Sequence, residues 1–262
     1  MTAIREPNFF ILGAQKSGTS YLAAALARHP DVYFTNPKEP LFFQKQGLTR
    51  ADYDEYLIDH FSDARDETWA GEGSTVYLQW PRALDHIRSF VPGTPKFIVC
   101  LRQPTEKAVS FYIHNWRRGR YPEGTTLQET LAMRDTLSVL FSSLYAPSIE
   151  RWFDAYPPEN FCFIDFATLQ RDPAAFVETA AALLGIDTSA IRIPDSTINE
   201  GIPLAWEGDE LIATRQPEAA NGPARFTRDS IAELHERCLP DISATEALTG
   251  LDLSNWRALP AF

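Results

Sequence analysis

The feature that most constrains the fold of this chain lies near its start: an apolar run over residues 9–12 stops at Gly13, and a helical pattern follows over Thr19–Arg28. A short run that is apolar at every position is typical of a parallel strand buried on both faces. The helical segment carries its apolar residues on one face, and His29-Pro30 ends it. This strand, turn and helix predict an α/β fold.

The same alternation of strand and helix patterns continues along the chain. Further strands are predicted at residues 32–34, 96–101 and 161–166, and helices at 53–61, 82–90, 104–117, 148–156 and 173–184. Residues 199–221 predict irregular structure, and 229–248 predict a last helical region that is interrupted near Pro240. Together these patterns predict a single α/β domain over residues 1–262, with a central parallel sheet flanked by helices.

Composition and charge narrow the classes of function. The chain has 262 residues, of which 44% are hydrophobic, and a formal net charge of −11. Such a charge repels nucleic acid and argues against a long sulfated polysaccharide as a substrate. No apolar run reaches the ~18 residues that span a bilayer, and residues 1–12 contain no signal-peptide core. The three cysteines, Cys100, Cys162 and Cys238, are odd in number, so neither a disulfide framework nor a zinc site is expected. The same cysteine content favours a cytoplasmic location.

The turn between the first strand and the first helix has the composition of a phosphate-binding loop. It reads Gly-Ala-Gln-Lys-Ser-Gly-Thr-Ser over residues 13–20, with a lysine, three hydroxyl side chains and two glycines. The glycines let the backbone bend around an anion, and the helix N-terminus offers unpaired N–H groups. The loop is not a Walker A motif, because Lys16 precedes Gly18 instead of following it. Anion binding is the prediction; a glycine turn with a surface lysine is the alternative.

A second phosphate contact is predicted at the end of the strand over residues 96–101. Arg102 follows that strand directly, and Ser110 lies eight residues later on the next helix. The planar guanidinium group of an arginine suits a phosphate, and a serine two helical turns on can return toward it. The spacing of Arg102 and Ser110 is weak evidence by itself, and it indicates a phosphate contact only because the chain also contains the loop of residues 13–20.

At these motifs the chain resembles the PAPS-dependent sulfotransferases (PAPS is 3′-phosphoadenosine 5′-phosphosulfate). It is most similar to the branch with heparan sulfate N- and 3-O-sulfotransferases and their bacterial relatives. FFILGAQKSGTSYL resembles the family's 5′-phosphosulfate loop, and FIVCLRQPTEKAVSFY its 3′-phosphate strand and helix. The similarity continues in order through HPDVYFTNPKEPLFF, GEGSTVYL, SLYAPSIERWFDAYPPENFCFIDF and LTGLDLSNW.

The resemblance implies a fold, a reaction and a set of site residues. The fold is P-loop-like, PAPS is the co-substrate, PAP is the product, and no metal is needed. A sulfuryl group would pass in line to a hydroxyl or amine of a small-molecule, lipid or glycan acceptor. The implied donor-binding residues are Lys16, Ser17, Gly18, Thr19, Ser20, Arg102, Ser110, Tyr145 and Arg225.

The catalytic base implied by the resemblance is Glu39, in the sequence KEPLFF. The alternative is that Glu39 forms a surface ion pair with Lys38 or Lys45. His114, four residues after Ser110, is the rival base, and Lys16 would supply catalytic positive charge.

Two positions depart from the family's pattern or match it weakly. Relatives usually carry lysine where this chain has Gly73, which puts a second catalytic cation in doubt. Glu72 is predicted either to line the cleft or to be a buried structural carboxylate. The loop 221–226 is the expected counterpart of a basic loop that closes over the nucleotide, with Arg225, or else Arg228, facing the phosphate.

Two other functions remain possible at this point. An apolar strand that ends at Asp165 superficially resembles a Walker B element, so a P-loop kinase or NTPase is one alternative. A non-catalytic nucleotide-binding module is the other. The acceptor and the oligomeric state are not predicted.

Overall fold

The fold is seen in a computed structural model that describes residues 4–133, 137–192, 194, 202–213 and 224–262. The chain divides into two compact units, each built from two separate stretches. Unit 1 comprises Met1–Leu101 and Ile149–Asn199, and unit 2 comprises Arg102–Ser148 and Glu200–Phe262. The chain passes repeatedly between these units. This division does not test the prediction of a single domain over residues 1–262, which stays a prediction.

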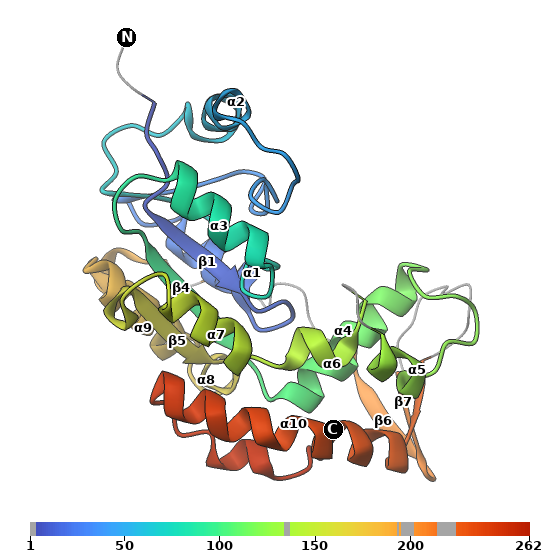
Figure 1. The fold of residues 1–262 in the computed structure, drawn as a ribbon. Helices are drawn as coiled ribbons and strands as arrows, with labels where there is room; N and C mark the ends of the chain where they lie inside the picture. The colour runs from blue at the N-terminus through green and yellow to red at the C-terminus, as the bar shows by residue number, and fades with distance from the viewer. Residues whose placement is uncertain (1–3, 134–136, 193, 195–201, 214–223) are drawn as a thin grey trace. The chain divides into compact units, whose positions relative to one another are not determined.

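Unit 1 contains the central sheet that the alternation of patterns predicts. Its five strands run parallel in the order β2-β3-β1-β4-β5. Their bounds are β1 Phe9–Gly13, β2 Val32–Phe34, β3 Trp69–Glu72, β4 Lys96–Leu101 and β5 Phe161–Asp165. Figure 1 labels β1, β4 and β5 of this sheet. β1 is the central strand of this order, and every residue of β1 is buried. The predicted fold class is therefore confirmed.

Layers of side chains cover both faces of the sheet in unit 1. Alternate residues of a strand point to opposite faces. Phe9 and Ile11 pack in a cluster with α1 and α9, whereas the Phe10 ring lies 5.8 Å from that of Phe43. The helices that lie wholly in unit 1 are α1 Thr19–Leu26, α2 Arg50–Phe61, α3 Pro81–Phe90, α8 Phe166–Arg171 and α9 Pro173–Leu184. Helix α7 Ala146–Phe153 begins in unit 2 and continues into unit 1 at Ile149. This packing fixes the carboxyl end of β1, where the phosphate loop begins.

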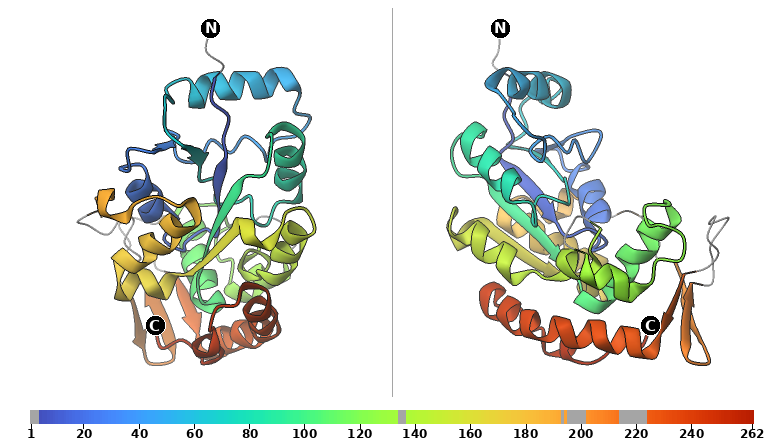
Figure 2. Two further views of the ribbon diagram at one scale, coloured as in Figure 1. Left: turned by 90° about the vertical axis from the view of Figure 1, so that its left-hand side faces the viewer. Right: turned by 45° about the vertical axis from the view of Figure 1, so that its right-hand side comes forward.

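Unit 2 is mainly helical and carries a small antiparallel sheet of order β6-β7-β8. Its elements are α4 Pro104–Arg117, α5 Leu127–Ala132, α6 Val139–Ser143, β6 Leu204–Glu207, β7 Glu210–Ala213, β8 Arg225–Thr227 and α10 Arg228–Thr249. Figure 2 shows the long helix α10 in red, and side chains of α4 and α10 share one apolar core. That core leaves only a narrow stripe of α4 accessible.

Two predictions about elements of unit 2 are wrong. The segment 199–221 was expected to be irregular, but its described part contains β6 and β7, joined at Gly208 with φ 63°. The helix α10 runs through Pro240 without interruption. Proline removes one backbone hydrogen bond from a helix. Residues on both sides of Pro240, Leu234 and Ile242 among them, are buried, so packing holds both halves of α10.

The described helices include none with the length and apolar composition that crossing a bilayer requires. The longest of them, α10, has 22 residues, and acidic and basic side chains recur along it.

The cysteines are free thiols in three different elements. Cys100 in β4 and Cys238 in α10 are fully buried, while Cys162 in β5 is partly exposed. Burial disfavours the charged thiolate and raises the pKa of Cys238 to about 12. Cys100 and Cys238 therefore act as small apolar residues, one in each unit.

Candidate functional site

The phosphate loop of unit 1 is shaped by a glycine that no other residue replaces without strain. Gly13 has φ 147°, and a Cβ added there would lie 2.7 Å from the carbonyl oxygen of Thr75. The next residue, Ala14, donates its N–H to the carbonyl of Cys100 at 2.7 Å. The loop thus leaves β1 in close contact with two neighbouring backbone segments.

The far end of this loop is an open helix N-terminus. Gly18 caps α1 with φ 82° and offers no side chain to the first N–H groups, and the first turn holds no acidic residue. Lys16 has φ 67°, a strained conformation for a residue other than glycine. Thr19 begins α1, and Ser17 lies buried just before it. Uncapped N–H groups, the positive end of the helix dipole and a lysine are the features that the predicted anion-binding site requires.

The segment of residues 36–44 lies beside the phosphate loop. We call it the base loop because it carries Glu39. Thr75 Oγ1 is 3.2 Å from both carboxylate oxygens of Glu39, and Lys38 Nζ is 2.9 Å from Oε1. Lys38 Nζ also lies 3.4 Å from Thr19 Oγ1. The ion pair with Lys38 that was the alternative interpretation of Glu39 therefore exists, but it adjoins the phosphate loop. The structure brings Glu39 and Thr19 into one polar network.

A buried carboxylate supports the base loop from behind. Glu72 is fully buried at the end of β3 and accepts hydrogen bonds from the hydroxyls of Tyr56, Tyr77 and Ser74. Desolvation raises the pKa of Glu72 to about 7, although these three bonds oppose the rise. Of the two predicted roles, the structure supports the buried structural carboxylate.

The hydroxyls bound to Glu72 also hold the backbone of the base loop. Ser74 Oγ accepts the N–H of Leu41 at 3.0 Å, and Tyr77 Oη accepts the N–H of Phe43 at 3.1 Å. Leu41 has φ 56°, so the loop keeps a strained turn two residues after Glu39. The carboxylate, the two hydroxyls and the two N–H groups make one continuous support for the loop.

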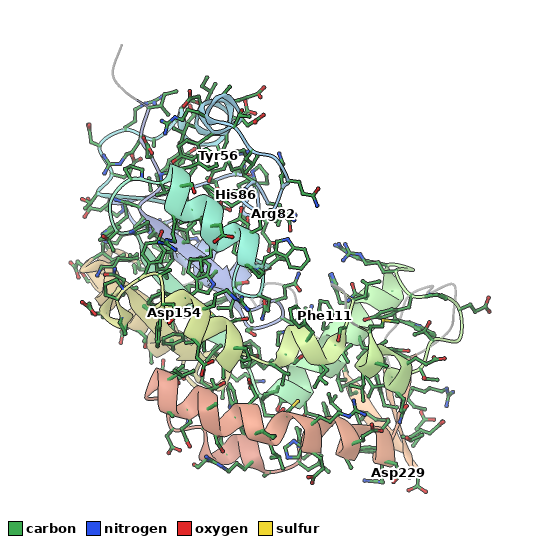
Figure 3. All side chains as sticks on the ribbon, viewed as in Figure 1. Tyr56, Arg82, His86, Phe111, Asp154 and Asp229 are labelled. Atoms are coloured by element: carbon green, nitrogen blue, oxygen red, sulfur yellow. The ribbon has the colours of Figure 1, made fainter. Side chains whose placement is uncertain are left out.

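Helix α3 supports the same loop from its other end. The Nδ1 atom of His86 lies 2.8 Å from the carbonyl oxygen of Phe43, and Arg82 donates to the carbonyl of Gln44 at 3.3 Å. Figure 3 labels His86 and Arg82 on α3 and Tyr56 on α2. Side chains from two helices and β3 thus fix a loop that has no regular structure itself.

In unit 2 the predicted 3′-phosphate residues lie on one stripe, which begins at Arg102, two residues before α4, and continues along the helix with Ser110. Arg102, Glu106, Ser110 and His114 follow each other at intervals of four, and each is partly exposed. Most other residues of α4 are buried. The guanidinium Nε of Arg102 lies 3.0 Å from a carboxylate oxygen of Glu106. The stripe therefore presents a guanidinium, a hydroxyl and an imidazole along one line, with one carboxylate among them.

Tyr145 lies behind Arg102. Its hydroxyl donates to the Arg102 carbonyl at 2.8 Å and lies 3.3 Å from the Arg102 N–H. The backbone N–H groups of Tyr145 and Ala146 both bond to the carboxylate of Asp241. Tyr145 is fully buried, so its contact is with the backbone that carries the guanidinium.

The predicted closing loop lies partly outside the described residues, since 221–223 belong to the part not described. Arg225 lies on β8, exposed, with its guanidinium 2.7 Å from Glu210. Arg228 begins α10, lies over the Trp206 ring at 4.1 Å and contacts Asp209 at 3.4 Å. A phosphate contact by either arginine stays a prediction.

The structure divides the predicted residues between the two units. Unit 1 holds Lys16, Ser17, Gly18, Thr19, Ser20 and Glu39, and unit 2 holds Arg102, Ser110, His114, Tyr145 and Arg225. Asp165, the residue of the alternative Walker B comparison, accepts the N–H of Ala167 and caps α8. Sequence reasoning did not identify Lys38, Thr75 and Glu106 as part of the site.

Comparison with known proteins decides the family. Residues 6–200 match the family model described as a sulfotransferase domain. The chain belongs to the sulfotransferase family. It is similar to the crystal structure of a sulfotransferase from Alicyclobacillus acidocaldarius, with a TM-score of 0.73 and 28% identity over 97% of this chain and 100% of that one. The family predicted from the sequence motifs is therefore confirmed.

Curated relatives of this sulfotransferase are much longer proteins. It is 28% identical over 203 residues to bifunctional heparan sulfate N-deacetylase/N-sulfotransferase 3 of Homo sapiens, which covers 71% of this chain and 23% of that protein. Enzyme 2 of the same name and organism is 27% identical over 201 residues, which is 71% of this chain and 22% of that protein. The sulfotransferase thus spans about a quarter of the length of these relatives.

Proposed function

We propose that this chain transfers a sulfuryl group from PAPS to a hydroxyl or amine of a small-molecule, lipid or glycan acceptor. The observation that carries the proposal is the link, through the ammonium of Lys38, between Thr19 at the start of α1 and the carboxylate of Glu39 in unit 1. Thr19, Lys38 and Glu39 link the anion-binding helix N-terminus to a base through distances of 3.4 and 2.9 Å. An anion-binding helix N-terminus beside a base is what transfer from a phosphosulfate requires.

The residues present suit the two charged ends of PAPS. Gly13 and Gly18 have positive φ and let the phosphate loop bend tightly into α1, whose first N–H groups have no side-chain cap, so the loop suits the 5′-phosphosulfate. In unit 2, Arg102 and Ser110 on the stripe of α4 suit the 3′-phosphate, and Tyr145 positions the Arg102 backbone. A site that pairs a 3′-phosphate leaves Arg102 without that partner when ATP binds, so it selects PAPS.

In the proposed reaction the acceptor oxygen or nitrogen attacks sulfur in line. A bond from sulfur to the acceptor forms as the bond from sulfur to the 5′-phosphate oxygen breaks, and the electron pair leaves with PAP. Glu39 takes the acceptor's proton, which typically contributes ~10²–10⁴-fold in rate. Lys16 and the N–H groups of α1 stabilise the charge that develops on the leaving phosphate. His114 stays a rival for the base or an acceptor contact.

The acceptor and the location are proposed from composition. A net charge of −11 favours a small or neutral acceptor over a polyanion. Three free thiols suit a reducing compartment such as the cytoplasm. The names of the curated relatives place an amine of a glycan among the acceptors to be tested.

The donor is tested by thermal unfolding of the full chain with PAP or ATP, each with and without Mg²⁺. We expect PAP alone to raise Tm, by the stabilisation that a ligand gives when it binds only the folded state. ATP should have little effect, and Mg²⁺ should change neither result. Stabilisation by ATP that needs Mg²⁺ would support a kinase or NTPase instead.

Transfer is tested with labelled PAPS and a defined acceptor panel: a nitrophenol, a sterol alcohol, and a glucosamine oligosaccharide with free amines. We expect label to pass to at least one of them. Glu39→Gln should lower kcat by about 10²–10⁴-fold and leave the Kd for PAP unchanged. The matched control is Glu55→Gln, an exposed position on α2. A Glu39→Gln variant with unchanged kcat would remove Glu39 as the base.

A further inference from the structure

We infer that Lys38 is a second catalytic cation of the sulfuryl-transfer site; this inference rests on the proposed function. The ammonium of a lysine has three donors. In this structure each meets an oxygen: Nζ lies 2.9 Å from Glu39 Oε1, 2.9 Å from the carbonyl of Gly73 and 3.4 Å from Thr19 Oγ1. The Lys38 side chain is only 20% exposed.

The contacts of Lys38 distinguish this pair from an ordinary surface ion pair. An exposed ion pair contributes little to stability. Lys38 Nζ instead makes contacts to three separate segments of unit 1: the base loop, the end of β3 and the start of α1. A cation held in this way is fixed in position before any substrate binds.

Gly73 provides the space that the Lys38 side chain occupies. A Cβ added at Gly73 would lie 3.2 Å from Lys38 Cε and 3.2 Å from Phe34 Cζ. The Gly73 N–H also donates to the Lys38 carbonyl at 3.0 Å, so the two backbones are paired. Glycine at this position therefore lets the lysine of the base loop lie over the end of β3.

The weakest of the three contacts points toward the phosphate loop. The distance from Nζ to Thr19 Oγ1 is the longest, and Thr19 is the first residue of α1. An oxygen of a sulfuryl group or 5′-phosphate bound at this helix N-terminus would replace the Thr19 hydroxyl as the third acceptor. Lys38 would then contact both the base and the transferred group.

The charge of Lys38 would act mainly in the transition state. Before the reaction, the carboxylate of Glu39 neutralises the ammonium at 2.9 Å. As Glu39 takes the acceptor's proton, its negative charge disappears. The ammonium then interacts with the sulfuryl oxygens and the leaving 5′-phosphate, where negative charge grows. An interaction that strengthens in the transition state raises kcat more than it changes ground-state binding.

The test compares Lys38→Met, which removes the charge, with Lys38→Arg, which keeps it. Each is assayed with labelled PAPS and an acceptor that the wild type uses, and the Kd for PAP and Tm are measured beside kcat. We expect Lys38→Met to lower kcat by about 10²-fold, with the Kd for PAP within about threefold of wild type. Lys38→Arg should recover at least a tenth of the wild-type kcat.

The matched control is Lys45→Met, which removes an exposed cation from the segment just after the base loop. It should leave kcat unchanged. A Lys38→Met variant with kcat within threefold of wild type would overturn the role of Lys38, and so would a Lys38→Arg variant as slow as Lys38→Met. If the wild type neither binds PAP nor transfers sulfate to any acceptor, the proposed function itself fails.

Discussion

Gly13 determines the path of the phosphate loop through a close backbone contact. Alanine there would place a Cβ 2.7 Å from the Thr75 carbonyl, and the Thr75 hydroxyl in turn contacts Glu39. A change at Gly13 is therefore transmitted to the base as well as to the loop.

We expect Gly13→Ala to lower the free energy of unfolding by about 1–3 kcal/mol, the usual effect of a strained backbone position, and to weaken PAP binding. Urea unfolding and calorimetry with PAP measure the two effects. Gly93→Ala is the matched control, because Gly93 has φ 71° but nothing within 4 Å of an added Cβ. Equal losses in both variants would show that positive φ, and not the contact with Thr75, determines the result.

Glu72 gives a prediction about pH. Burial raises the pKa of Glu72 to about 7 from its ordinary value of 4.5, so between these values the folded state binds more protons than the unfolded state. The stabilising contribution of Glu72 to the free energy of unfolding is therefore fully present below pH 4.5 and is lost as pH rises through 7. Glutamine at this position cannot titrate, so Glu72→Gln should remove the part of the decrease in the free energy of unfolding that Glu72 causes. Urea unfolding at several pH values from 4.5 to 7.5 measures it.

The control for Glu72→Gln is Glu150→Gln, an exposed position on α7. Its free energy of unfolding should keep the wild-type dependence on pH. Parallel pH curves for wild type and Glu72→Gln would contradict the raised pKa.

At the scale of elements, α4 combines a buried helix with one accessible stripe. The ion pair between Arg102 and Glu106 holds the guanidinium, but it also places a carboxylate beside the proposed 3′-phosphate site. A phosphate and a carboxylate compete for the same donors.

We expect Glu106→Gln to tighten PAP binding by about threefold to tenfold, because the competing charge is removed while the side chain keeps its size. Calorimetry with PAP measures the change, and Glu236→Gln, at an exposed position of α10, should leave the Kd unchanged. Weaker binding in Glu106→Gln would mean that the carboxylate positions Arg102 for the phosphate.

The elements predicted most accurately are those with an unambiguous apolar pattern. The strand over residues 96–101 and the helices over 104–117 and 173–184 match β4, α4 and α9. The strand β3, sequence WAGE, was not predicted, because it is four residues long and contains a glycine and a glutamate. The hairpin of β6 and β7 has mixed polarity, so its pairing depends on packing within unit 2.

The site was predictable where a local motif carries it. The phosphate loop and Arg102 follow strands directly, and their positions come from chain order alone. The contacts of Lys38 with Thr19 and Gly73 join residues 19 and 35 positions apart, and no local pattern encodes them. The support of the base loop by Glu72 likewise depends on the tertiary structure.

On the scale of the whole molecule, the acidic net charge contrasts with the proposed anion site. The chain carries 35 acidic and 24 basic residues, yet the first turn of α1 contains no acidic side chain. Dispersed acidic charge discourages polyanions at long range, whereas Lys16, Lys38 and the N–H groups of α1 act locally. This contrast favours a compact nucleotide over a polymer.

One buried thiol in each unit makes the local opening of that unit measurable by chemical modification. Cys100 lies in unit 1 and Cys238 in unit 2, both sealed from solvent, so an alkylating reagent reaches each only when its surroundings open. Mass spectrometry of the modified peptides would time the two openings separately in the wild-type chain. A donor nucleotide bound at the phosphate loop should slow the modification of Cys100, which lies in the same unit, and the rate at Cys238 reports on unit 2 by itself.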